Sequence, residues 1–330
     1  MFSGSLVAIV TPMHPDGGID WPGWERLLAL HLQAGTSGIV VGGSTGESVT
    51  LTEEELMQLL ARARAQLGGR AALIAGAGTS STAATVERAR RLSAAGIDGL
   101  LVVTPAYNKP TQEGLYRHFE AVAAASTVPV LLYNVPARTA VDLQPETVAR
   151  LAKLPRIVAI KEAVAAVERV REMLELTGGM FTVLSGDDVT CTEAMLNGAQ
   201  GVISVTANVL PGAMVRLCAA ALRGERAAAL GIDAALADLN EALFVEPNPI
   251  PVKWALADQG VIGAGVRLPL TPLSAAQHAR VRSALTQAHR RLAQLDSEQQ
   301  RTAGTTPASI APPRTGVAQG KPAAAQAKPA

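Results

Sequence analysis

Short apolar runs that alternate with segments of helical spacing are the feature that most constrains how this chain can fold. The apolar runs cover residues 6–10, 38–41, 72–75, 100–104, 130–133, 157–160, 182–184 and 202–205. Between them apolar residues recur at helical spacing, over residues 24–32, 52–67, 82–95, 113–125, 145–154, 167–176, 190–197 and 211–222. Eight strand–helix units in about 220 residues match a closed (β/α)₈ TIM barrel, although an open doubly wound sheet has the same local pattern. We therefore expect an α/β fold, with the barrel favoured.

The pattern changes after the eighth unit. Residues 226–244, 251–257 and 275–295 have helical spacing with no strands between them. We predict a catalytic barrel over residues 1–225 and a C-terminal helical appendix, packed on the barrel, over residues 226–296. Residues 297–330 are rich in Ala, Pro, Thr, Gln and Gly and lack aromatic side chains. Because this tail buries little apolar surface to offset its ordering entropy, we predict that it is disordered.

Composition excludes several classes of function. The net charge is +1 and aromatic residues make up only 3% of the chain, which argues against a nucleic-acid-binding surface. Two cysteines without paired spacing indicate a reducing compartment. The N-terminal stretch lacks signal-peptide character, and no apolar run approaches the roughly 18 residues of a membrane span. We expect a soluble cytoplasmic protein that binds neither nucleic acid nor membrane.

Lys161 directly follows the apolar run at residues 157–160. At the C-terminal end of a strand buried on both faces, this lysine would enter a water-poor space where desolvation disfavours the ammonium form. Such a lysine can be a nucleophilic amine near neutral pH. A lysine that extends its amine to solvent is the commoner outcome for one residue alone, so the other strand ends must decide.

Functional residues of TIM barrels follow the strands, and polar groups stand at these positions here. The second run precedes the glycine-rich turn GGSTGES, which contains Ser44 and Thr45, and Tyr107 follows the fourth. The fifth run ends at Tyr133 and is followed by Arg138, a candidate clamp for a carboxylate. Residues 185–188, SGDD, suit either a helix cap or a substrate contact, and residues 246–251 suit a stiff connector. No histidine pair has metal-ligand spacing, and no Gly-x-Ser-x-Gly motif follows a strand.

Seven segments together resemble the dihydrodipicolinate synthase family of pyruvate-dependent class I aldolases. They are GGSTGES, TPAYNKPTQEGLYRHF, LLYNVPARTA, IVAIKEA, LSGDD, GVISVTANV and FVEPNPIPVKWAL. The resemblance covers residues 2–295 and leaves out the tail. It implies a lyase that condenses pyruvate with L-aspartate 4-semialdehyde to 4-hydroxy-tetrahydrodipicolinate, the first committed step of diaminopimelate and lysine biosynthesis, with no metal or organic cofactor.

The resemblance also assigns roles. Lys161 would form a Schiff base with pyruvate, and Tyr133 would donate and accept protons through Thr45 and through Tyr107 of a neighbouring subunit. Ser44 and Thr45 would hold the pyruvate carboxylate, and Arg138 that of the aldehyde substrate. The last two predicted site residues, Gly186 and the Ile203 carbonyl, would line the pocket. The family implies a homotetramer, a dimer of dimers. Most members have threonine at the position of Ser44, and losing one methyl should matter little.

Regulation is where the sequence departs from the family. Members inhibited by lysine bind it with histidine, asparagine, glutamate and tyrosine side chains at a subunit interface. The matching positions here are Glu53, Leu56, Ser80, Ala84 and Ala106, and only Ser48 is retained. We therefore predict weak or absent lysine inhibition. Two other functions stay open from the sequence: N-acetylneuraminate or 2-keto-3-deoxy sugar acid aldolase of the same superfamily, and a non-catalytic keto-acid-binding barrel. Arg138 favours the synthase over the sugar-acid enzymes.

Overall fold

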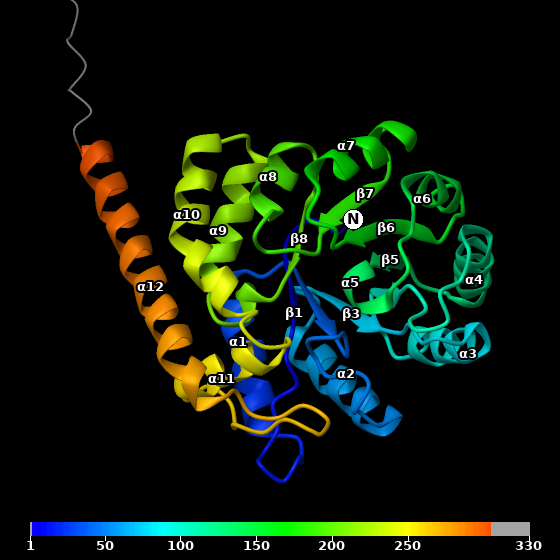
Figure 1. The fold of residues 1–330 in the computed structure, drawn as a ribbon, viewed down its shortest axis with the longest axis horizontal. Coiled ribbons are helices and arrows are strands. Elements are labelled where there is room, and N and C mark those ends of the chain that lie inside the picture. Colours follow the sequence, from blue (N-terminus) through cyan, green and yellow to red (C-terminus); the bar gives the residue numbers. More distant parts are fainter. Residues whose placement is uncertain (1, 305–330) are drawn as a thin grey trace, which may run out of the picture.

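The computed structural model describes residues 2–304, and within them eight parallel strands close into a barrel in the order of the sequence (Figure 1). The strands are β1 (Gly4–Ala8), β2 (Gly38–Val41), β3 (Ala72–Gly76), β4 (Gly99–Val103), β5 (Val130–Asn134), β6 (Ile157–Glu162), β7 (Thr182–Ser185) and β8 (Gly201–Ser204). All eight predicted runs overlap these strands, with ends that differ by two residues at most. The TIM barrel prediction is confirmed, because β1 pairs with both β2 and β8.

Helices follow the strands and cover the outside of the barrel (Figure 1). They are α1 (Trp21–Ala34), α2 (Glu53–Leu67), α3 (Thr82–Ser93), α4 (Gln112–Ala125), α5 (Pro136–Thr139), α6 (Pro145–Leu151), α7 (Val167–Leu176), α8 (Cys191–Leu196) and α9 (Pro211–Leu222), with a 3₁₀ turn η1 at Thr206–Asn208. Local sequence explains their ends. Thr52 caps α2 and Glu55 reaches back to it, the reciprocal arrangement that satisfies two otherwise unpaired N–H groups. The short helix α5 was not predicted, because four residues are too few to establish a helical period.

Apolar side chains fill both faces of the barrel wall, which is why its strands are continuous apolar runs and not alternating ones. Inward-facing residues form one cluster inside the barrel, and outward-facing residues pack against the helices in a second, larger cluster. Tyr133 belongs to the inner cluster. Side chains of β5 and β6 therefore alternate between the inside of the barrel and its helical shell.

The C-terminal appendix consists of α10 (Arg226–Ala242), α11 (Ile250–Asp258) and α12 (Ala275–Gly304). Helix α10 packs between α9 and α12, and α12 lies at the edge of the molecule (Figure 1). The prediction of a disordered tail from residue 297 is wrong for residues 297–304, which continue α12. Extending a formed helix fixes one residue per new hydrogen bond, so these helix-compatible residues need little further burial. Residues 305–330 lie outside the described part of the chain.

None of the helices in residues 2–304 is long and apolar enough to span a membrane.

Candidate active site

Lys161 stands near the C-terminal end of β6, beside Tyr133 of β5. The two residues are register partners across the β5–β6 ladder, and the Lys161 Nζ lies 4.5 Å from the centre of the Tyr133 ring. Both side chains are buried, with exposed fractions of 5% and 7%. Within residues 2–304 no carboxylate forms an ion pair with Lys161. An amine that is buried and unpaired beside a phenol is arranged for chemistry and not for stability.

Gly186, at the end of β7, makes room for the lysine. A Cβ at this position would lie 2.9 Å from Cε of Lys161 and 2.9 Å from Cβ of Ala163. Both contacts are shorter than van der Waals distance, and the second involves a side chain that cannot rotate away. Glycine is therefore required here by the space that Ala163 and Lys161 occupy together.

A cavity of about 420 Å³ opens at this end of the barrel. It collects six of the eight predicted site residues: Ser44, Thr45, Tyr133, Arg138, Lys161 and Gly186. These residues come from the ends of β2, β5, β6 and β7, which are far apart in sequence and meet because parallel strands bring their C-terminal ends to one face. The volume suits small molecules with a few polar groups.

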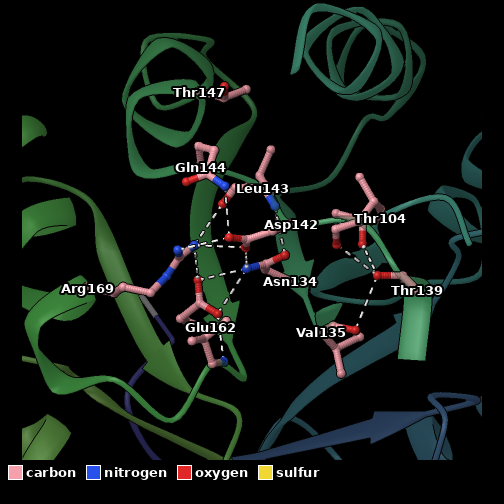
Figure 2. Close-up of polar contacts among 12 residues, drawn as sticks. Thr104, Asn134, Val135, Thr139, Asp142, Leu143, Gln144, Thr147, Glu162 and Arg169 are labelled. Atoms are coloured by element: carbon pink, nitrogen blue, oxygen red, sulfur yellow. Dashed lines mark hydrogen bonds and ion pairs between the residues drawn. The ribbon is translucent and has the colours of Figure 1, made fainter. Parts of the chain in front are cut away.

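The residues that directly follow Tyr133 and Lys161 are joined outside the barrel wall (Figure 2). Asn134 Nδ2 lies 3.0 and 3.1 Å from the Glu162 oxygens and 2.7 Å from Asp142 Oδ1. Arg169 spans both carboxylates, at 3.0 Å from Asp142 and 3.4 Å from Glu162. Burial raises the pKa of Glu162, opposed by hydrogen bonds from the Val164 N–H and Asn134 and by the charge of Arg169. This network fixes the spacing of the two strand ends that carry the amine and the phenol.

The GGSTGES turn is held from two sides. Thr11 Oγ1 donates a hydrogen bond of 2.7 Å to the Gly46 carbonyl. Glu47 has a left-handed backbone, with φ of 56°, and its buried carboxylate pairs with Lys253 of α11 and accepts from the Arg267 N–H. The turn that presents Ser44 and Thr45 is therefore anchored by the appendix, a connection that the sequence pattern did not indicate.

Arg138 lies in α5, where a threonine fixes the turn. The hydroxyls of Thr139 and Thr104 lie 3.2 Å apart and join α5 to the end of β4 (Figure 2). Arg138 donates a hydrogen bond of 3.2 Å to the main-chain carbonyl of Asn248. The guanidinium lines the cavity and is paired with no carboxylate in residues 2–304, so its charge is available for an anionic ligand.

Two predicted site residues are not among those that line the cavity. Tyr107 is 93% exposed and has a φ of 73°, while Ile203 is fully buried within β8. Conversely, the cavity contains Asn248, which lies in the predicted connector and received no functional role from the sequence. Its proximity to other motifs in the fold was the missing information, since nothing in the local pattern separates a connector from a cavity wall. Asp187 of the SGDD segment both lines the cavity and accepts hydrogen bonds from Thr190.

A second cavity, of about 630 Å³, adjoins the first and shares Ser44, Arg138 and Asn248 with it. Four residues that line it stand at positions where lysine-inhibited family members bind lysine: Ser48, Glu53, Ser80 and Ala106. The Glu53 carboxylate is already engaged by Arg88 at 3.2 Å and by Arg91 at 2.5 Å. Burial lowers the pKa of Arg88, but the guanidinium keeps its ion pair.

The fold and the first cavity define a class: a (β/α)₈-barrel protein with an unpaired lysine and a tyrosine at the C-terminal ends of neighbouring strands. Comparisons with known proteins narrow this class. Residues 1–288 match the model of the dihydrodipicolinate synthetase family. The chain is 51% identical to 4-hydroxy-tetrahydrodipicolinate synthase of Pseudomonas aeruginosa over 87% of its own length and 98% of the relative. It is 52% identical, with the same coverage, to the synthase of Nitrosococcus oceani.

Comparison with solved structures gives the same family. The chloride-inhibited dihydrodipicolinate synthase of Acinetobacter baumannii in complex with pyruvate superposes with a TM-score of 0.86 at 47% identity, covering 88% of this chain and 99% of that one. This chain therefore belongs to the dihydrodipicolinate synthetase family, as the resemblance of its motifs implied.

Proposed function

We propose that this chain is a 4-hydroxy-tetrahydrodipicolinate synthase, a lyase that condenses pyruvate with L-aspartate 4-semialdehyde. The observation that carries the proposal is the unpaired, buried Lys161 amine beside the Tyr133 ring in a cavity that also contains Arg138. Family membership and relatives of that name support it. The rival sugar-acid aldolase and non-catalytic barrel have no observation in their favour.

Lys161 acts as the nucleophile. Its neutral amine attacks the pyruvate carbonyl carbon, water leaves, and a protonated imine forms. The positive nitrogen makes the adjacent methyl group acidic, so loss of one methyl proton gives an enamine. The enamine carbon forms a bond to the aldehyde carbon of the second substrate, whose oxygen takes up a proton. The amino group of that substrate then attacks the imine carbon, closes the ring and releases Lys161 as the amine.

The other residues bind and move protons. Tyr133 lies against the lysine and is the group placed to receive and return protons at the imine and the aldehyde oxygen. Thr45 relays these protons, and Ser44 and Thr45 hold the pyruvate carboxylate. Arg138 binds the carboxylate of the aldehyde substrate, with its guanidinium oriented by the Asn248 carbonyl. Gly186 forms part of the pocket wall. We expect no requirement for a metal or organic cofactor, because the imine itself accepts the electron pair, and dialysis against EDTA should leave the rate unchanged.

Borohydride reduction in the presence of pyruvate tests the first step. It should convert the imine to a stable secondary amine on Lys161, detected by peptide mass spectrometry. In a separate reaction without borohydride, pyruvate and L-aspartate 4-semialdehyde together should yield the cyclic product, which separates the synthase from a sugar-acid aldolase. Unlabelled Lys161 would exclude both aldolases and leave only a binding protein.

The remaining residue of the proton relay, Tyr107, would come from a second copy of the chain. Tyr107 and Val49, exposed by 93% and 92%, both follow strand ends on the active-site side of the barrel. We propose that a second copy covers this region and that its Tyr107 completes the relay, in a homotetramer built as a dimer of dimers. Sedimentation equilibrium measures the assembly. A fully active monomer would contradict the shared-site arrangement.

Lysine feedback should be weak or absent. Glu53 and Arg88 line the second cavity, and the Glu53 carboxylate is already paired with Arg88 and Arg91, so two guanidinium groups oppose the approach of an ammonium. Rate measurements at increasing lysine test this, and strong inhibition below millimolar concentration would contradict it. We also propose a cytoplasmic location, supported by the two free, buried cysteines Cys191 and Cys218, and fractionation of cells would test it.

A further inference from the structure

Asn248 contacts two residues of the catalytic cavity, Thr45 and Arg138, although it lies outside the barrel. It lies in the connector before α11, yet its side chain is only 7% exposed and lines the cavity. Its Nδ2 lies 2.9 Å from Thr45 Oγ1, across 203 residues of sequence. Its main-chain carbonyl accepts the hydrogen bond from Arg138. One residue therefore contacts both a group of the proposed proton relay and the proposed clamp for the aldehyde substrate.

The chemistry of the amide determines what Thr45 can do. An amide nitrogen donates and cannot accept, so the Thr45 oxygen must be the acceptor in this bond. A hydroxyl carries a single proton, and this bond does not use it. In residues 2–304 the bond to Asn248 is the only one that involves the Thr45 hydroxyl. The proton of Thr45 thus stays available for transfer within the cavity.

The Asn248 amide donates to Thr45 although this orientation leaves its own oxygen without a hydrogen-bond partner in residues 2–304. Asn248 Oδ1 is buried without a hydrogen-bond partner in the described residues. An unpaired buried acceptor is costly, so a side chain with a purely structural role would be expected to satisfy both ends. The bond to Thr45 is the only side-chain hydrogen bond that Asn248 makes there.

We propose that Asn248 is a positioning residue that sets the direction of proton transfer through Thr45. By donating to the Thr45 oxygen, it keeps the hydroxyl proton directed away from the connector and toward the groups that exchange protons with the substrate. This inference rests on the proposed function, since it assumes that Thr45 carries protons during the reaction. Asn248 itself transfers none.

Replacement of the Asn248 amide by an isosteric carboxylate tests whether the direction of its hydrogen bond with Thr45 matters. In Asn248→Asp the side chain keeps its size but is an ionised carboxylate at about pH 8, which only accepts hydrogen bonds. The Thr45 hydroxyl would then donate its proton to this carboxylate and not to groups in the cavity. Asn248→Ala removes the donor without reversing the bond, and its main-chain carbonyl still faces Arg138. The best readout is exchange of pyruvate methyl hydrogens into D₂O, followed by NMR without the aldehyde, because this step needs proton transfer but not Arg138.

We expect methyl exchange and kcat to fall by about 10²-fold in Asn248→Asp and by about tenfold in Asn248→Ala, while borohydride still labels Lys161 to completion. In a Thr45→Val background, Asn248→Asp should cause no further loss. A rate within threefold of the wild type in Asn248→Asp, or equal losses in the two variants, would overturn the proposal. Additive losses in the Thr45→Val background would do the same.

Asn240 provides a matched control. It is also a buried asparagine of the appendix beside a threonine, but its Oδ1 accepts from Thr206 at 2.7 Å and it does not line the cavity. Asn240→Ala should lower the melting temperature without slowing methyl exchange. If the wild type itself fails to form the pyruvate adduct, the proposed function fails. If the wild type reacts and Asn248→Asp keeps its rate, only the present inference fails.

Discussion

Lys161 and Lys253 are both buried, and the structure uses them in opposite ways. Lys161 is 5% exposed, lines the catalytic cavity and has no ion-pair partner in residues 2–304. Lys253 is 2% exposed and forms an ion pair with the fully enclosed carboxylate of Glu47. Burial lowers the pKa of Lys253, and the charge of Glu47 opposes that shift. Burial alone therefore does not identify a reactive lysine, because the presence or absence of a counter-ion decides whether the amine is held or available.

The largest expected difference between the two lysines is in covalent chemistry. Lys161→Ala should abolish borohydride trapping of pyruvate and the condensation reaction, because no other lysine of residues 2–304 lines the cavity. It should not lower the melting temperature by more than a few degrees, since Lys161 has no ion pair to lose in the part of the chain that the structure describes. Peptide mass spectrometry and thermal denaturation measure the two effects. Residual pyruvate labelling of another lysine in this variant would contradict the assignment.

Tyr133→Phe should slow the reaction by about 10²–10⁴-fold, the usual range for loss of one oriented proton-transfer group. The ring remains, so the packing against Lys161 and the stability should be preserved. Steady-state kcat and the rate of methyl exchange are the measurements. A loss confined to the Michaelis constant for pyruvate would show that the hydroxyl binds substrate and does not transfer protons.

Arg138→Ala separates the two substrates. We expect kcat/KM for the aldehyde to fall by about 10–10²-fold, in keeping with the loss of charged hydrogen bonds to a carboxylate. Pyruvate trapping on Lys161 should be unaffected, because the amine and Arg138 act on different substrates. Equal losses in pyruvate trapping and aldehyde use would refute this division of roles.

The smallest effect on the reaction should come from the second lysine. Lys253→Met leaves the Glu47 carboxylate buried and unpaired, which should destabilise the fold by about 3–5 kcal/mol. Lys161 should still form its imine with pyruvate in this variant. Chemical denaturation and borohydride trapping test the two statements. Glu47→Leu combined with Lys253→Met should recover much of the lost stability, because it removes the unpaired charge. Failure of the double variant to recover would show that the pair also specifies the turn.

Much of the site could be predicted because a TIM barrel places its functional side chains just after the C-terminal ends of its strands, and those ends can be located in the sequence. The strand ends were located within two residues, so Lys161, Tyr133 and Thr45 could be assigned to one face from the sequence. The contributions of the appendix could not be predicted. Asn248 and Lys253 reach the site from a connector and a helix whose local patterns encode only their own conformation.

The sequence by itself determined the alternation of strands and helices, the residues at each strand end and the family. Those properties depend on side-chain periodicity and residue type, both of which are local. Only the tertiary structure decided which buried lysine is paired, which carbonyl orients Arg138 and which amide meets Thr45. These contacts join segments more than a hundred residues apart, as with the 203 residues between Thr45 and Asn248. They depend on the relative placement of barrel and appendix, which a local pattern does not specify.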